Sequence, residues 1–202
     1  MSYRYEDKIV LSPSELRVLK ANLLNISLKH LHEPRVINSV YFDNLNFDSF
    51  NLSEEGVVPR KKIRIRNYPQ TKNQHYFLEE KVTSDDGRFK QSKQIDLIKV
   101  NKFLNFGYID KDLGLMKASI EIRYLREYYS FQGLRITFDQ NIKYFSYKRK
   151  MMFPPELWNV VEIKYKNISD LEKIDHLNSY PRERFSKYCR GIINNKTHIN
   201  IA

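Results

Sequence analysis

The chain has 202 residues, a length typical of one domain, and 35 Lys and Arg against 24 Asp and Glu give a net charge of +11. A hydrophobic content of 41%, with 14 Tyr, 12 Phe and one Trp, excludes a disordered basic tail. The single cysteine, Cys189, excludes a disulfide framework or a cysteine zinc site, and six glycines without a G-x-G-x-x-G or P-loop pattern exclude the usual nucleotide-binding loops. We therefore expect a single folded domain over residues 1–202, whose basic charge suits nucleic acid, a membrane surface or a small polyanion.

The same features bear on location. No apolar stretch approaches the ~20 residues that a membrane-spanning helix needs, so no transmembrane segment is expected. Met1–Lys8 carries four charges and no hydrophobic run, which is unlike a secretory signal. A lone cysteine also suits a reducing compartment. These observations predict a cytoplasmic protein.

The first predicted helix follows a short alternating strand over residues 3–10. Ser12 and Glu15 form an S-x-x-E capping box, and Pro13 takes the first helical position. Leucines at helical spacing follow these residues. The pattern predicts a helix over residues 13–28 whose leucines pack in the core.

Most of the remaining chain is predicted to form short strands. A short helix is expected from Leu97 to a stop at Gly107, a second helix begins with the capping box at Ser169, and Pro181 is expected to start the final helix. The strands are predicted over residues 36–43, 60–68, 74–83, 90–95, 119–129, 134–139 and 159–166. About eight strands at short spacing favour a barrel or a sandwich over a parallel α/β sheet.

Several of these strands place charged side chains on one face. In K-I-R-I-R, Lys62–Arg66, the isoleucines face one way and the cations the other, and the pattern E-x-K recurs at Glu6, Glu79 and Glu162. A solvent-exposed sandwich face explains any one such strand. A barrel with apolar residues outside and a polar lumen explains their repetition. Because unpaired buried cations are costly, such a lumen has to hold a polyanion, such as a polyphosphate with a divalent metal.

Six motifs in order along the chain resemble the VTC domain. They are R-Y-E-D-K (Arg4–Lys8), S-V-Y-F-D (Ser39–Asp43), K-I-R-I-R-N-Y (Lys62–Tyr68), L-E-E-K (Leu78–Lys81), V-E-I-K (Val161–Lys164) and F-S-K-Y-C-R-G (Phe185–Gly191). This is the polyphosphate polymerase domain of the vacuolar transporter chaperone complex, and it also occurs as free-standing bacterial proteins. It belongs to the CYTH-like triphosphate tunnel metalloenzymes. The resemblance implies an α+β fold in which a closed antiparallel β-barrel of about eight strands forms a charged tunnel, with flanking helices and a C-terminal helix at one tunnel mouth.

The resemblance also implies an activity and a set of site residues. The chain is expected to be an ATP–polyphosphate phosphotransferase that passes the γ-phosphate of ATP to a growing inorganic polyphosphate chain. The cations implied to bind phosphate or nucleotide are Lys8, Arg64, Arg66, Lys81, Lys93, Arg126, Arg135, Lys164 and Lys187. The residues implied to be catalytic are Lys8, Arg64, Arg66, Lys81, Glu162 and Lys187.

Some of these assignments have alternatives. Glu162 resembles the carboxylate that binds Mn²⁺ or Mg²⁺, and Glu6 is a second candidate ligand. Lys90 competes with Lys93, and Arg123 with Arg126, for their places in the motif.

Rival functions are also open. The wider superfamily begins with E-x-E-x-K, whereas this chain has Arg4-x-Glu6-x-Lys8, a departure that favours the VTC branch over a two-metal triphosphatase. A tripolyphosphatase or nucleoside triphosphatase remains the closest alternative, because the same phosphate cradle serves both reactions. A non-catalytic polyphosphate-binding module is a third possibility. A nucleic-acid-binding barrel is the fourth, although the aromatic residues fall mostly opposite the cations instead of among them. We expect ATP and polyphosphate as partners, and no nucleic acid.

Overall fold

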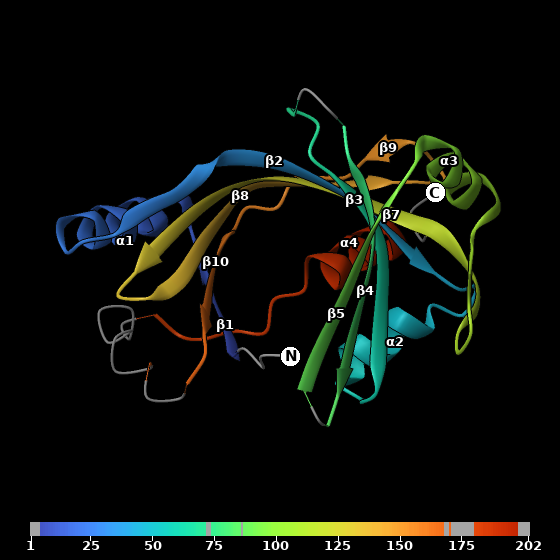
Figure 1. Ribbon diagram of the computed structural model, residues 1–202, viewed down its shortest axis with the longest axis horizontal. Coiled ribbons are helices and arrows are strands. Elements are labelled where there is room, and N and C mark those ends of the chain that lie inside the picture. Colours follow the sequence, from blue (N-terminus) through green and yellow to red (C-terminus); the bar gives the residue numbers. More distant parts are fainter. Residues whose placement is uncertain (1–4, 72–73, 86, 168–169, 171–179, 198–202) are drawn as a thin grey trace. The chain divides into compact units, whose positions relative to one another are not determined.

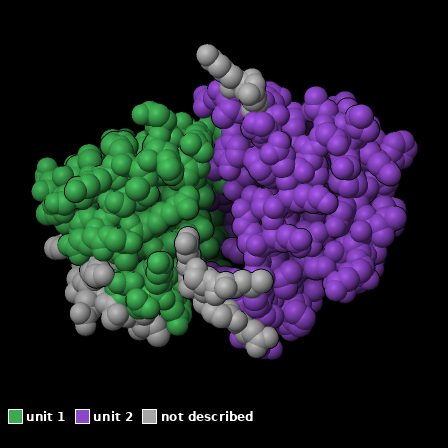
Figure 2. Space-filling view, viewed as in Figure 1, with its two compact units in different colours: residues 1–36, 124–142, 155–185 green, residues 37–123, 143–154, 186–202 purple. Residues whose placement is uncertain are grey.

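The computed structural model describes residues 5–71, 74–85, 87–167, 170 and 180–197. The chain divides into two compact units, coloured separately in Figure 2. Unit 1 comprises Met1–Val36, Tyr124–Ile142 and Pro155–Phe185, and unit 2 comprises Ile37–Arg123, Lys143–Pro154 and Ser186–Ala202. The single domain over residues 1–202 therefore stays a prediction, and each unit is described by itself.

The strands form antiparallel ladders, so the predicted α+β class is confirmed. They are β1 (Tyr5–Leu11), β2 (Lys29–Asp43), β3 (Arg60–Asn67), β4 (Tyr76–Ser84), β5 (Gly87–Ile95), β6 (Tyr108–Asp110), β7 (Gly114–Phe131), β8 (Leu134–Ser146), β9 (Met151–Met152) and β10 (Asn159–Tyr165). Their hydrogen-bonded order is β1-β10-β8-β7-β2-β3-β4-β5, with β6 paired to β7 and β9 paired to β8. The end strands of this order are β1 and β5, so backbone hydrogen bonds between described residues do not close the predicted barrel.

In unit 1, helix α1 (Pro13–Asn25) covers the apolar face of the strands (Figure 1). The capping box is present: the Glu15 backbone N–H donates to Ser12 Oγ at 3.3 Å, and the Ser12 N–H donates to Glu15 Oε2 at 2.8 Å. The helix ends before residue 28 because Ser27 takes a left-handed conformation, with φ of 85°. Its leucines pack on a core of buried residues from β1, β7, β8 and β10. Burial of this face orients the opposite face of the same strands, which carries the charged residues.

In unit 2, helix α3 (Leu97–Phe106) packs Val100 against the isoleucines of β3. Asp96 caps this helix by accepting the Lys99 N–H at 2.8 Å, and the helix stops before Gly107 as predicted. Helix α2 (Asp48–Glu55) was not predicted. A residue of the preceding strand satisfies two of its first N–H groups, because the Asp43 carboxylate accepts from the backbones of Ser49 and Phe50.

The prediction that the last helix starts at Pro181 is wrong. Helix α4 runs over Lys187–Thr197. The preceding residues are engaged with β1: Arg182 forms a bridge with Ile9, and the Glu183 N–H donates to the Lys8 carbonyl at 2.9 Å. Backbone groups that pair with β1 in this way are not available for the hydrogen bonds of a helix. The helix predicted from Ser169 lies outside the described residues.

Within the described part of the chain, every helix is too short or too polar to cross a bilayer.

Candidate functional site

The first cluster of predicted site residues lies on one face of the β3–β5 sheet in unit 2, which we call the unit 2 face. Arg64 pairs with Glu79, Lys62 with Lys81, and these β4 residues pair in turn with β5. Alternation along the three strands brings seven basic residues to this face: Arg60, Lys62, Arg64, Arg66, Lys81, Arg88 and Lys90. Glu79 is the single carboxylate among the described residues of the same face. The unit 2 face is therefore strongly cationic.

Glu79 joins three of these cations. Its carboxylate accepts from Arg64 Nε at 2.7 Å and lies 2.5 Å from Lys90 Nζ and 3.7 Å from Arg66 Nε. The carboxylate is 5% exposed, and its burial by itself would raise its pKa. Arg64, Arg66 and Lys90 overcome that effect and lower the pKa of Glu79 to about 2. Glu79 is thus a permanent anion that fixes the positions of the two arginines.

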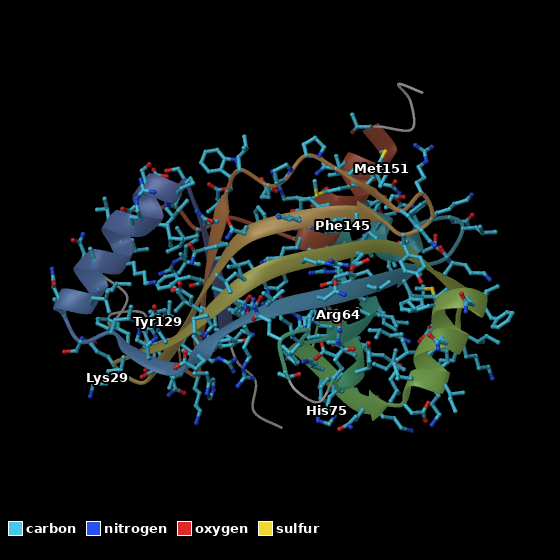
Figure 3. The ribbon with its side chains drawn as sticks, turned by 90° about the horizontal axis from the view of Figure 1, so that it is seen from above. Lys29, Arg64, His75, Tyr129, Phe145 and Met151 are labelled. Carbon is cyan, nitrogen blue, oxygen red and sulfur yellow. The ribbon has the colours of Figure 1, made fainter. Side chains whose placement is uncertain are left out.

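Aromatic residues hold the other side of Arg64, which is labelled in Figure 3. Arg64 Nη1 donates to Tyr41 Oη at 2.6 Å, and its guanidinium carbon lies 5.4 Å from the centroid of the same ring. Tyr41 stacks on Tyr188 of α4 with ring centroids 5.0 Å apart. Tyr188 in turn donates its hydroxyl hydrogen to Asp43, whose pKa is raised by burial. Arg64 is therefore held between a carboxylate and a packed aromatic pair.

Helix α4 begins beside the unit 2 face. Lys62 Nζ donates to Ser186 Oγ at 3.1 Å and lies 5.6 Å from the centroid of Tyr188. Lys187, half-buried, is the first residue of the helix and lies between these two contact residues in sequence. The structure thus brings the start of α4, with Lys187, to Lys62 and Tyr41 of the same unit.

Lys93, the first choice over Lys90, does not lie on the unit 2 face. It pairs with Leu78, and alternation places it on the opposite face, where it lines a groove of about 350 Å³ with Glu80 and residues of α3. Lys90 pairs with Lys81 and contacts Glu79. The sequence could not show this difference, because it depends on the register of β5, in which Ser84 pairs with Gly87, and a shift of one residue inverts every side chain.

The second cluster lies on one face of β1, β10, β8 and the last part of β7 in unit 1, which we call the unit 1 face. Lys8 pairs with Glu162, Glu6 with Lys164, and Lys164 with Arg135. The charged residues of this face are Glu6, Lys8, Arg126, Arg135, Asp139, Glu162 and Lys164. Four bases and three acids nearly balance.

Glu162 is central in this face. Its carboxylate lies 2.7 Å from Lys164 Nζ and 3.2 Å from Arg126 Nη2. Burial opposes ionisation, but Arg126, Lys164 and Lys8 hold the pKa of Glu162 well below its usual range. Glu6 lies 3.4 Å from Lys8 Nζ and 3.6 Å from Lys164 Nζ. The carboxylates of Glu6 and Glu162 therefore both lie beside the Lys164 ammonium group.

Arg126, the first choice over Arg123, lies on the unit 1 face, and its role there stays a prediction. Its guanidinium makes two hydrogen bonds with the fully buried Asp139, at 2.5 and 2.6 Å. Arg123 is exposed, pairs with Glu121 and lies over Phe145. Arg135 is exposed, lies over Tyr128 and, with Lys164, lines a cavity of about 380 Å³.

The acids of the unit 1 face suit a hard divalent cation. Mg²⁺ takes oxygen ligands and is commonly held through one or two carboxylates together with substrate phosphates. Glu162 and Glu6 are such carboxylates, and both point at Lys164. Among residues 5–71, 74–85, 87–167, 170 and 180–197, no three His, Cys, Asp or Glu side chains converge into a complete ligand set. The donor set therefore fits a metal that shares its coordination with phosphate.

Tyr41, Tyr188 and Asp43 were not among the predicted site residues. One signal was present in the sequence: in S-V-Y-F-D, alternation puts Ser39, Tyr41 and Asp43 on the same face of β2. Tyr188 has no such signal, because its place depends on how α4 packs.

Comparison with known proteins agrees with this arrangement. The family model of the VTC domain matches residues 3–194. The chain belongs to the VTC domain family. No curated protein matches the sequence.

Among solved structures, a candidate adenylate cyclase from Bacillus halodurans superposes with a TM-score of 0.65 at 13% identity, over 92% of this chain and 94% of that one. A protein from Pyrococcus horikoshii gives 0.59 at 19% identity, over 91% and 95%. A candidate adenylate cyclase from Vibrio parahaemolyticus gives 0.56 at 13%, over 92% and 95%. The fold of this VTC domain is that of the CYTH-like triphosphate tunnel proteins.

Proposed function

We propose that this VTC domain is an ATP–polyphosphate phosphotransferase, which transfers the γ-phosphate of ATP to the end of an inorganic polyphosphate chain in the tunnel that the resemblance predicts. The observation that carries the proposal is the unit 2 face, with seven bases and one carboxylate along three strands. Polyphosphate is charged along its whole length, so it matches closely spaced cations on successive strands better than a compact anion does.

The geometry of the unit 2 face suits binding of phosphate oxygens. In the proposal, Arg64 and Arg66 bind these oxygens through their planar guanidinium groups, which match phosphate geometry. Glu79 and Tyr41 hold Arg64 in position before the substrate arrives. Phosphoryl transfer needs positioning and charge compensation more than covalent help from the protein, and donors fixed in advance provide both.

Further cations complete the proposed phosphate site. Lys81 and Lys90 add charge to the unit 2 face, and Lys187 at the start of α4 neutralises the acceptor end of the chain. In unit 1, Lys8, Arg126, Arg135 and Lys164 bind further oxygens. These roles divide the substrate's charge among many groups.

Glu162 holds the metal ion, Mn²⁺ or Mg²⁺, with Glu6 as its second ligand. When bound, the ion supplies charge neutralisation on the phosphate oxygens. Arg126 keeps its bond to Asp139 in this arrangement, so Glu162 is free to turn toward the metal without leaving Arg126 unpaired.

Product analysis tests the proposal. The purified chain is incubated with ATP and Mn²⁺ or Mg²⁺, and the products are separated on a gel and by chromatography. Long phosphate chains are expected, with one ADP released for each phosphate added. Free orthophosphate alone would indicate the triphosphatase, and cyclic AMP with pyrophosphate would indicate the activity suggested by two of the structural neighbours; either result overturns the proposal.

Two variants connect the products to the site. Glu162→Gln keeps the shape of the side chain and removes the charge that binds the metal, so metal-dependent synthesis should fall by about a hundredfold or more. Arg123→Ala is the matched control, because this exposed arginine pairs with Glu121 and lies over Phe145, neither of which is a proposed site residue. A Glu162→Gln variant with full turnover would contradict the metal assignment.

A further inference from the structure

Helix α3 presents large apolar side chains away from the core of unit 2. Ile98, Lys102 and Phe106 follow one another at four-residue spacing and form a single ridge, while Val100 on the other side is buried. Ile98 is 81% exposed and Phe106 70% exposed. An apolar ridge facing solvent has no role in the core of the unit.

The β6–β7 hairpin continues this ridge. Ile109 and Leu115 are directly paired, and they are 79% and 50% exposed. Lys117 shares the strand face of Leu115, and its Nζ donates to the Phe106 carbonyl at 2.7 Å. The link is Gly107: a Cβ there would lie 2.9 Å from Leu115 Cδ1 and 3.1 Å from the Lys117 side chain, so these side chains pack directly over the helix end.

We call this patch the α3 surface: Ile98, Lys102, Phe106, Ile109, Leu115 and Lys117. Helix α3 and strand β7 are labelled in Figure 1. Residues 96–118 contain four lysines and three aspartates. Asp110 and Asp112 contact Lys61 Nζ, at 2.8 and 2.7 Å, and Asp96 lies 3.6 Å from Lys99 Nζ. All three acids are therefore engaged in ion pairs, and Lys102 and Lys117 supply the charge of the α3 surface itself.

We propose that the α3 surface is a peripheral docking site for an anionic lipid bilayer. Exposed aliphatic and aromatic side chains among lysines are the features with which helices bind the membrane interface, where the apolar groups enter the acyl boundary and the lysines contact anionic headgroups. A second copy docked face to face would set lysines against lysines. The site is independent of the proposed transferase reaction and lies outside its residues.

Vesicle co-sedimentation of the full chain tests this docking. The protein should partition into phosphatidylcholine vesicles that contain phosphatidylglycerol, and much less into pure phosphatidylcholine. The double variant Phe106→Ser with Ile109→Ser should bind at least about tenfold more weakly, because two apolar side chains no longer leave water. Leu157→Ser is the matched control, since Leu157 is 76% exposed and belongs to unit 1, outside the α3 surface, and its partitioning should be unchanged.

Two further measurements test the contribution of the lysines and the insertion of residue 106 into the bilayer. Lys102→Glu should weaken binding about fivefold or more, whereas Lys29→Glu, at an exposed position of β2 in unit 1, should have a much smaller effect. Phe106→Trp in a Trp158→Phe background should show a blue shift in emission with anionic vesicles. The proposal is overturned if vesicles do not bind the chain, if the double variant binds as tightly as the parent, or if light scattering shows a dimer that the double variant abolishes.

Discussion

The two charged faces use the same E-x-K pattern and reach different electrostatic states. On the unit 1 face, three of the four bases contact the three acids, so that Glu162 lies between Arg126 and Lys164 and Asp139 binds Arg126. On the unit 2 face, Glu79 is the one described carboxylate among seven bases. The pattern in a single strand does not decide the net charge of a face; the partners supplied by neighbouring strands do.

The difference has a physical consequence. In a nearly neutral network, contacts between opposite charges offset most of the cost of removing those charges from water. An excess of like charge destabilises a compact state through repulsion. A bound polyanion relieves that repulsion and binds the folded state in preference to the unfolded one. We therefore expect a bound polyanion to stabilise unit 2 chiefly by compensating the excess positive charge of the unit 2 face. We expect the ion pairs of the unit 1 face to persist without ligand.

The largest expected effect comes from removing both arginines of the unit 2 face. Arg64→Ala with Arg66→Ala should lower the rate of polyphosphate synthesis by about a thousandfold or more, because single preorganised donors at developing charge are each worth about a hundredfold. The rate is measured by ADP release at saturating metal. Arg123→Ala should retain the parental rate, and a double variant that matches it would remove the unit 2 face from the site.

The second effect separates the faces by stability. Glu79→Gln leaves three cations without their shared carboxylate and should lower the free energy of unfolding by about 3 kcal/mol, as expected for breaking a buried pair. Added tripolyphosphate should then stabilise this variant more than it stabilises the parent. The measurement is a denaturant titration with and without the anion.

Glu162→Gln is the matched variant for that titration. Asp139 and Glu6 still oppose the bases of the unit 1 face, so the gain from tripolyphosphate should be smaller than in Glu79→Gln. Equal gains in both variants would show that the two faces do not differ as their charges indicate.

The third prediction concerns acid. The pKa of Glu79 is about 2 in the folded state against 4.5 for an ordinary glutamate, so the folded state binds this proton less tightly than the unfolded state does. Its contribution is complete above pH 4.5 and is lost as the pH falls toward 2, by an amount on the order of 3 kcal/mol. In Glu79→Gln, the free energy of unfolding should fall less steeply than in the parent over that range. Parallel curves would mean that Glu79 is not held as an anion by Arg64 and Arg66.

Much of the fold could be predicted from local patterns. The capping box at Ser12 and the alternation in Lys62–Arg66 depend on neighbouring residues alone, and the structure contains both. Helix α2 could not be predicted, because its cap is the carboxylate of Asp43 in a different element. The wrong prediction of a helix start at Pro181 has the same cause. Pairing of this segment with β1, near the start of the sequence, overrides the local helix-start signal.

The candidate site divides in the same way. The motifs predicted Arg64, Arg66 and Glu162, and they put Lys93 before Lys90 in a choice that depends on strand register. One motif contains Tyr188, but it could not show the contact of Tyr188 with Asp43, which joins positions 145 residues apart in sequence. Contacts between distant segments are set by packing, which short motifs do not encode.

The smallest expected effect tests the register that assigns Lys90 to the unit 2 face. Lys90→Ala removes one cation beside Glu79 and should weaken binding of tripolyphosphate about fivefold, because one charge near a phosphate chain is worth on the order of 1 kcal/mol. Lys93→Ala changes a side chain on the opposite face, next to Glu80 and α3, and should leave that affinity unchanged. Isothermal titration of both variants makes the comparison. If Lys93→Ala weakened binding and Lys90→Ala did not, the β5 side chains of the phosphate site would be those that pair with Leu78 and Glu80, and the face with one carboxylate would not be the one that binds the anion.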